Sequence, residues 1–139
     1  MKKLKLGIPK GSLESATVDL FAQAANYPAI ESIAKKYNLI LIEDAAQGLG
    51  TKICKQRAGS FGCLAITSFF PAKPLGCCGG CGAFFTNNDN FADLIGSFRV
   101  HGKGKDKYDN IRIGINSHFD TIQAAILIEK LAEFEVELE

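Results

Sequence analysis

A lysine beyond the end of an apolar strand is the residue of this chain best suited to covalent chemistry. Residues 63–69 read as a strand, and Lys73 follows Ser68 by five positions, in a run that continues into glycine-rich sequence. A lysine amine becomes nucleophilic where its surroundings favour the uncharged form, and it then condenses with an aldehyde. The run therefore indicates a lysine nucleophile, with a solvated loop lysine as the alternative.

A second strand delivers a carboxylate. Leu39-Ile40-Leu41-Ile42 is continuously apolar, as in a strand buried on both faces of a parallel sheet, and Glu43-Asp44-Ala45-Ala46-Gln47 follows it. Asp44 could act on a bound group at this strand end. The alternative is a structural carboxylate that caps the next turn. Together, the two strand ends predict half of a binding site. The chain is short to hold the other half as well.

Composition excludes several classes of function. The chain has 139 residues, 47% of them apolar and 22% charged, which fits one globular domain with a real core. Lys+Arg 16 against Asp+Glu 15 gives a net charge of +1, which argues against a nucleic-acid partner. No apolar run approaches the roughly 18 residues of a membrane span, and no signal sequence is evident. We expect a cytoplasmic protein with no membrane partner.

Alternating strand and helix patterns predict an α/β fold. We expect one domain over 1–139, a three-layer αβα sandwich with a mainly parallel sheet and room for one antiparallel edge strand. The predicted strands are 4–8, 39–42, 63–69 and 82–86. The predicted helices are 13–25, a short one through Ile30, Ile33, Ala34 and Tyr37, then 90–98 and 119–138, with a polar loop at 99–111.

From about residue 27 to the C-terminus, the chain resembles the DegT/DnrJ/EryC1/StrS sugar-nucleotide aminotransferases, which are pyridoxal phosphate (PLP) enzymes of the aspartate-aminotransferase fold. Several ordered motifs carry the resemblance, which makes it specific. The matching runs are Ile42–Gly50, Arg57–Gly62, Ser68–Gly76, Arg99–Gly102, Asp109–Ser117 and Asp120–Ala125. They correspond to the middle of a full family member.

The resemblance implies a role for five residues. Lys73 would form the covalent bond to the cofactor aldehyde, and Asp44 would pair with the pyridine nitrogen, so that the ring acts as an electron sink. Gln47 would lie against the ring oxygen, and Ser68 would bind the cofactor phosphate. Asn116 would reach the phosphate of a neighbouring subunit in a homodimer, and it would have no such task in a monomer. A surface amide and an ordinary strand serine are the alternatives for Gln47 and Ser68.

Parts of the family's site have no counterpart in this sequence. Family members add an upstream phosphate-binding loop, an aromatic residue that stacks on the cofactor ring, and a C-terminal small domain. Catalytic groups must be held within fractions of an ångström, so we expect little turnover from the half that is present. Whether this chain holds PLP or no cofactor at all stays open on sequence grounds.

The first 26 residues suggest a different origin. Leu6-Gly7-Ile8-Pro9-Lys10-Gly11-Ser12-Leu13-Glu14 resembles the N-terminus of the short-form ATP phosphoribosyltransferases. The leading hypothesis is therefore an engineered chimera with a seam near 26–27 and a vestigial PLP site. The alternative is a truncated aminotransferase fragment that still binds PLP through Lys73. A nucleotide-binding module at Lys10–Ser12 is a distant third.

The sequence departs from the family pattern directly after Lys73. The family has Cys-Tyr-Gly-Asp-Gly-Gly-Ala there, whereas this chain has Cys77-Cys78-Gly79-Gly80-Cys81-Gly82-Ala83. Cys78 and Cys81 form a Cys-x-x-Cys pair, but a structural zinc takes four ligands and no matching second pair is present. We therefore predict no metal site, and reduced thiols rather than disulfides at all five cysteines.

Overall fold

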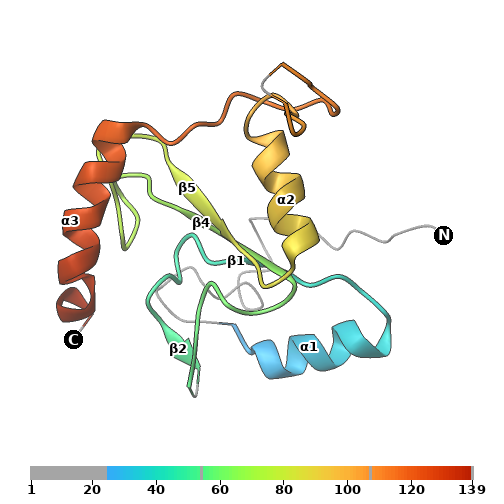
Figure 1. Cartoon of the computed structure of the whole chain (residues 1–139). Helices are drawn as coiled ribbons and strands as arrows, with labels where there is room; N and C mark the ends of the chain where they lie inside the picture. Colours follow the sequence, from blue (N-terminus) through green and yellow to red (C-terminus); the bar gives the residue numbers. More distant parts are fainter. Residues whose placement is uncertain (1–24, 54, 107, 139) are drawn as a thin grey trace.

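The computed structural model describes residues 25–53, 55–106 and 108–138 (Figure 1). The strand predicted at 4–8 and nearly all of the helix predicted at 13–25 lie outside these residues, as do Lys10, Gly11 and Ser12. The structure therefore bears on the part of the chain that carries the predicted site.

A three-stranded sheet organises the described residues. It contains β1 (Ile42–Asp44), β4 (Leu64–Ser68) and β5 (Gly82–Phe85), in the order β1-β4-β5. β1 pairs with β4 in parallel, and β4 pairs with β5 in antiparallel fashion. The α/β class and the antiparallel edge strand are thus confirmed, but the described sheet is mixed rather than mainly parallel. The three-layer sandwich stays a prediction.

The first strand of this sheet begins later than the sequence pattern predicts. Asn38 adopts a left-handed conformation with φ of 51°, and the Leu39 amide donates to the Ala34 carbonyl at 2.8 Å. Leu39, the first residue of the apolar run, thus belongs to the turn that ends the preceding helix rather than to the strand. Ile40 and Ile42 are 58% and 55% exposed, so the prediction of a strand buried on both faces is wrong for the described residues.

Each of the three described helices begins at a side-chain cap. They are α1 (Tyr27–Lys36), α2 (Asp89–Phe98) and α3 (Thr121–Glu137), close to the predicted bounds. Asn26, Asn88 and Asp120 accept hydrogen bonds from the first free amides of the helices, which otherwise lack a partner within the helix. Within the described ranges, no helix is long and apolar enough to cross a membrane.

The main core lies between α3 and the connection from β4 to β5. Figure 1 shows α3 apart from α1 and α2, with the sheet between them. The buried cluster consists of Phe69, Leu75, Cys77, Leu127 and Phe134. Phe69 precedes Lys73 in the connection after β4, and Leu75 and Cys77 follow it, so the segment that carries Lys73 is anchored at both ends by apolar packing against α3.

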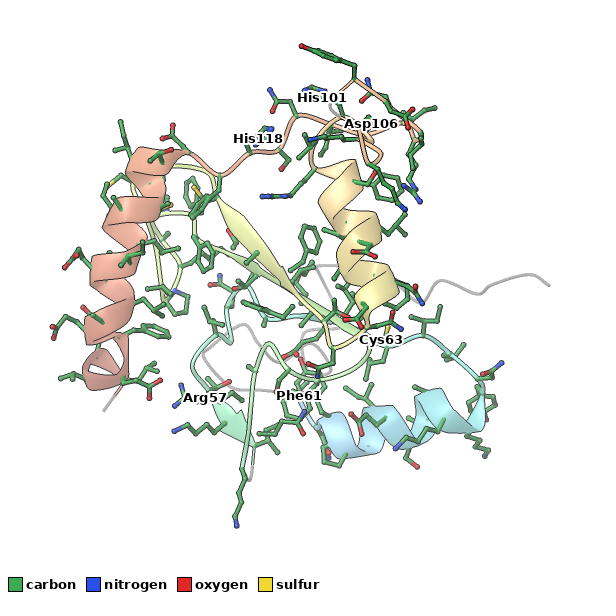
Figure 2. All side chains as sticks on the ribbon, in the orientation of Figure 1. Arg57, Phe61, Cys63, His101, Asp106 and His118 are labelled. Carbon is green, nitrogen blue, oxygen red and sulfur yellow. The ribbon has the colours of Figure 1, made fainter. Side chains whose placement is uncertain are left out.

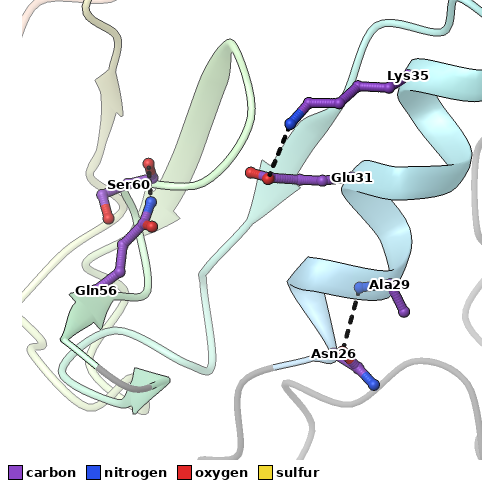
Figure 3. A network of polar contacts seen from close by, with 6 residues as sticks. All are labelled: Asn26, Ala29, Glu31, Lys35, Gln56 and Ser60. Carbon is purple, nitrogen blue, oxygen red and sulfur yellow. Dashed lines mark hydrogen bonds and ion pairs between the residues drawn. The ribbon is translucent and has the colours of Figure 1, made fainter.

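A small antiparallel hairpin was not predicted. It pairs β2 (Lys52–Ile53) with β3 (Gln56–Arg57), and the Gln56 side-chain amide donates to the Ser60 carbonyl at 2.9 Å (Figure 3). The same figure shows the Asn26 cap at Ala29 and the Glu31–Lys35 ion pair of α1. Strands of two residues carry too little alternation to be recognised from sequence.

Arg57 joins this hairpin to α3 through a two-pronged ion pair with Glu135. The hydrogen bond from Arg57 lowers the pKa of the Glu135 carboxyl from its usual range. The pair therefore stabilises the fold above the unfolded pKa of Glu135, and this stabilisation is lost as the pH falls through the lowered folded value. The two side chains are 43% and 58% exposed, so the effect is small.

We expect Glu135→Gln to lower the urea midpoint slightly at pH 7 and to leave it unchanged in acid, where the wild-type carboxyl is also neutral. Paired urea titrations of both proteins at the two pH values measure this. Glu133→Gln, on the same helix, is the matched control and should leave the midpoint unchanged at pH 7. Equal effects of the two substitutions would show that the Arg57 contact contributes nothing.

Candidate functional site

Asp44 and Ser68 lie at the same edge of the sheet. They end β1 and β4, which run parallel, so their carboxyl ends meet. Asp44 is in register with Ile66, and Ser68 is two residues further along β4. Side chains two residues apart on a strand share a face, so Asp44, Ile66 and Ser68 lie on one face. The structure thus brings together two of the residues that the sequence singled out.

The end of β1 is held rigidly against β4. The Ala45 amide donates to the Ile66 carbonyl at 2.8 Å, and the buried Thr67 hydroxyl donates to the Ala45 carbonyl at 3.3 Å. Asp44 itself is exposed, and one carboxylate oxygen accepts from the Ala46 amide at 3.0 Å. Gln47 is exposed in the turn that follows. The local bond supports the capping interpretation of Asp44, yet it leaves the second oxygen available to a ligand.

Lys73 lies in the turn that follows β4. Its backbone amide donates to the Phe70 carbonyl at 2.9 Å, and the Phe70 amide donates to the Ser68 hydroxyl oxygen at 3.3 Å. The Lys73 side chain is half-buried, and it forms no ion pair within the described part of the chain. Ser68 and Lys73 therefore belong to one continuous turn at the edge that Asp44 also occupies.

Two side chains of α3 fix the far end of this turn. The Lys130 ammonium donates to the Gly76 carbonyl at 2.6 Å, and the Gln123 side-chain oxygen accepts from the Cys78 amide at 2.8 Å. A Cβ at Gly76 would lie 2.8 Å from the carbonyl oxygens of both Phe70 and Pro71, so only glycine fits there. These roles were not evident from the sequence, although Gln123 stands within one of the motifs that resemble the family.

Glu43 is a second residue that sequence analysis missed. Its side chain is only 1% exposed, and its two carboxylate oxygens accept from the Gly59 and Phe61 amides, both at 2.8 Å. Figure 2 shows Phe61 near the start of α1, where its ring stacks on Tyr27 at a centroid distance of 4.1 Å. The alternation of β1 offered a signal, because Asp44 on one face requires Glu43 to point to the other.

Asn116 lies on the segment between α2 and α3. It is exposed and forms an isolated antiparallel bridge with Val100, and Figure 2 places His101 and His118 on the same loop region. Among the described residues, no hydrogen bond joins Asn116 to Asp44, Ser68 or Lys73. Asn116 thus lies on a different segment of the chain from the other predicted cofactor residues.

The connection between β4 and β5 is rich in cysteines. Cys63, Cys77, Cys78 and Cys81 are free thiols. No group of three or more histidine, cysteine or acidic side chains is placed to hold an ion, as far as the described ranges extend. The loop therefore contributes thiols and backbone contacts to the region beside Lys73.

Two surface hollows lie away from the predicted site. One is lined by Pro28, Phe61 and the hairpin that carries Arg57, and the other lies between α1 and the start of β1. Neither is lined by Lys73, Asp44 or Ser68. The predicted residues thus lie along the sheet edge rather than in either hollow.

Comparison with known proteins identifies the origin of this sheet edge. The family model of the DegT/DnrJ/EryC1/StrS aminotransferases matches residues 16–139. The chain belongs to this family. This aminotransferase family is PLP-dependent, and a similar chain, NtdA from Bacillus subtilis with bound cofactor PMP, has a TM-score of 0.74 at 34% identity, covering 86% of this chain and 26% of that one.

Two further relatives show how much of a DegT-family protein is present. The UDP-2-acetamido-2-deoxy-3-oxo-D-glucuronate aminotransferase of Pseudomonas aeruginosa is 48% identical over 121 residues, which are 87% of this chain and 33% of that protein. A family aminotransferase from Brucella abortus superposes with a TM-score of 0.82 at 55% identity, over 85% of this chain and 32% of that one. The chain thus spans about a third of these relatives.

The chimera hypothesis receives no support from these matches. The family match begins at residue 16, within the segment that was compared with ATP phosphoribosyltransferases, and it continues through residues 26 and 27. Nothing in the comparisons supports a phosphoribosyltransferase segment. The short N-terminal resemblance rested on nine residues, whereas the DegT-family match extends over most of the chain. The alternative interpretation, a fragment of a sugar aminotransferase, fits better.

Proposed function

We propose that this chain is the cofactor-anchoring part of a PLP-dependent sugar-nucleotide aminotransferase and that it binds PLP through Lys73. The observation that carries the proposal is the shared sheet edge, where Asp44, Ser68 and the Lys73 turn meet. An edge formed by the carboxyl ends of parallel strands is a common place for ligands in α/β proteins.

The donor set fits PLP chemically. The Asp44 carboxylate would accept the proton of the pyridine nitrogen, and the Ser68 hydroxyl, whose oxygen already accepts from Phe70, would donate its own proton to the phosphate. Gln47, exposed after Asp44, would lie against the ring oxygen. Lys73 would supply the amine that bonds to the aldehyde. Bound PLP supplies the electron sink on which amino-group transfer depends.

A second copy of the chain would give Asn116 its task. Asn116 is exposed on a segment whose apolar residues also face outward, with Ile113 98% and Ile115 66% exposed. Exposed apolar side chains that lie near one another are typical of a surface that contacts another protein. We propose that Asn116 binds the cofactor phosphate of a partner subunit in a homodimer.

The names of the relatives describe aminotransferases that act on sugar nucleotides. By analogy, we propose that a sugar nucleotide accepts the amino group.

Titration with PLP tests the proposal directly. We expect an imine absorption band to appear on mixing, and Lys73→Ala to abolish it because that substitution removes the reacting amine. Lys105→Ala, at an exposed position in the 99–111 loop, is the matched control and should leave the band unchanged. A thermal melt supplies a second readout, since saturation at about 100 times Kd stabilises a protein by about 2.7 kcal/mol.

Two results would contradict PLP binding at Lys73. One is a band of equal strength in wild type, Lys73→Ala and Lys105→Ala, which would mean unspecific reaction with surface lysines. The other is the absence of both the band and a melting shift in wild type. Asp44→Ala should weaken the band without removing the reacting amine, which separates cofactor positioning from covalent attachment.

A further inference from the structure

Three thiols lie in the connection from β4 to β5, and two of them meet in the core. Cys77 is 3% exposed and belongs to the buried cluster, and Cys81 is half-buried and packs against that cluster. Cys77 is one of the groups that raise the pKa of the Cys81 thiol, as expected of a close neighbour. Cys78, between them in sequence, is exposed.

The backbone brings Cys77 and Cys81 together by attaching both to one residue. The Cys77 amide donates to the Phe69 carbonyl at 2.8 Å, and the Phe69 amide donates to the Cys81 carbonyl at 2.7 Å. The Cys77 thiol also donates to the Phe69 carbonyl at 3.0 Å. Because Phe69 directly follows β4, the two cysteines are held side by side at the end of that strand rather than by chance contact of mobile side chains.

We propose that Cys77 and Cys81 form a reversible dithiol–disulfide site, oxidised by small disulfides of the glutathione class. Disulfide formation requires two cysteines whose Cβ atoms approach within about 4.5 Å. The attachment of both backbones to Phe69 and the packing of Cys81 against the cluster that contains Cys77 favour such an approach. The proposal does not depend on PLP binding or on aminotransferase activity.

Thiol–disulfide exchange between the two cysteines and the small disulfide proceeds in two steps. The more accessible Cys81, as thiolate, attacks one sulfur of the small disulfide; a mixed disulfide forms and one small thiolate leaves. The Cys77 sulfur then attacks the Cys81 sulfur, so that the Cys77–Cys81 bond forms and the second small thiol departs. Two cysteine thiols are oxidised, one small disulfide is reduced to two thiols, and the two cysteine protons end on them.

The surroundings of Cys81 set the pH range of the reaction. Partial burial, the hydrogen bond and charge of Cys77, and the charge of Asp120 together raise the pKa of Cys81 to about 11. Little thiolate is therefore present at neutral pH, and oxidation is slow there. Because only the thiolate attacks, the rate should rise roughly tenfold per pH unit between about pH 7 and 9.

The cross-link would act on the turn that carries Lys73. It would close a ring over Cys77–Cys81 that contains Gly79 and Gly80, and a Cβ at Gly80 would meet nothing within 4 Å. The amide of Cys78, inside this ring, is the group that Gln123 holds. Oxidation would therefore constrain the segment between the Lys73 turn and β5, at the point where Gln123 of α3 also accepts a hydrogen bond from it.

Differential alkylation of the unmodified chain tests the site. The protein is incubated with oxidised glutathione, its free thiols are blocked with light iodoacetamide, and the reduced protein is then labelled with the heavy reagent. Fragment-ion mass spectrometry locates each label. We expect heavy label on Cys77 and Cys81 and light label on Cys78 and Cys63, together with a mass lower by two hydrogens before reduction. Cys78→Ser is the matched control and should leave the pairing and its rate unchanged.

The alternative outcomes each overturn the proposal. Heavy label on Cys78 and one neighbour, with the loss of two hydrogens and no glutathione adduct, would assign the reaction to a different pair. A lasting glutathione adduct on Cys81 would show that Cys77 cannot reach the Cys81 sulfur. Loss of the reaction in Cys78→Ser would make the exposed thiol necessary. Light label on all cysteines after prolonged incubation at pH 9 would show that no disulfide forms.

Discussion

Glu43→Ala is expected to destabilise the chain by about 3 kcal/mol or more, because it leaves two buried amides without an acceptor. The Glu43 carboxylate now accepts from Gly59 and Phe61, and neither its side chain nor Phe61 is more than 4% exposed. Water cannot replace the lost oxygens without opening the segment. Urea unfolding followed by circular dichroism measures the difference in the free energy of unfolding.

The neighbouring residue provides the control for this prediction. Asp44→Ala removes an exposed carboxylate from the same strand, so its effect on stability should stay within about 1 kcal/mol. Glu43→Gln should lie between the two, since its amide keeps one acceptor oxygen but turns an NH₂ group toward a donor. Similar losses for Glu43→Ala and Asp44→Ala would show that the buried carboxylate does not hold the 59–61 segment.

Consecutive acids of β1 thus have opposite tasks. Glu43 points into the protein and fixes the segment that follows the hairpin, and Asp44 points outward at the predicted cofactor edge. The sequence pattern indicated a role for Asp44 but not for Glu43, since an acidic residue in a strand is usually solvated. The buried partner becomes visible only when the amides of a distant loop are seen to converge on it.

Helices were predicted more accurately than strands. α2 and α3 combine a capping residue with apolar spacing over at least 10 residues, and both signals are local. β1 has only three residues, and its register comes from pairing with β4, more than 20 residues away in sequence. The β2–β3 hairpin was missed for another reason, because strands of two residues carry too little alternation to be recognised.

In the candidate site, too, features with a local signal in the sequence were predicted, and features that depend on distant residues were missed. Ser68 and Lys73 were recognisable because Ser68 ends a strong apolar strand and Lys73 follows it, and the structure links both through one turn. The contacts of Gln123 and Lys130 with that turn could not be predicted, because they come from α3, 45 residues beyond Cys78 and 54 beyond Gly76. Residues proposed to bind the cofactor were thus easier to find than residues that hold their turn in place.

Gly102→Ala is expected to destabilise the chain by about 2–4 kcal/mol and to loosen the loop that carries Asn116. Gly102 has a φ of 75°, and an added Cβ would overlap the carbonyl oxygen of Arg112. Its amide donates to the Ser97 carbonyl at 2.9 Å, and its carbonyl accepts from the Arg112 amide at 3.2 Å. A methyl group there must separate two backbone segments that now hydrogen-bond to each other.

Gly96→Ala is the matched control, because Gly96 lies in α2 and a Cβ there would meet nothing within 4 Å. That substitution should stabilise the chain by about 0.5–1 kcal/mol, as alanine does in a helix. Urea titrations compare the two variants, and hydrogen exchange should show faster exchange at 98–116 in Gly102→Ala alone. Equal stability of the two variants would mean that the loop does not need its close backbone approach. Asn116 would then lack the fixed position that its proposed contact with a partner's phosphate requires.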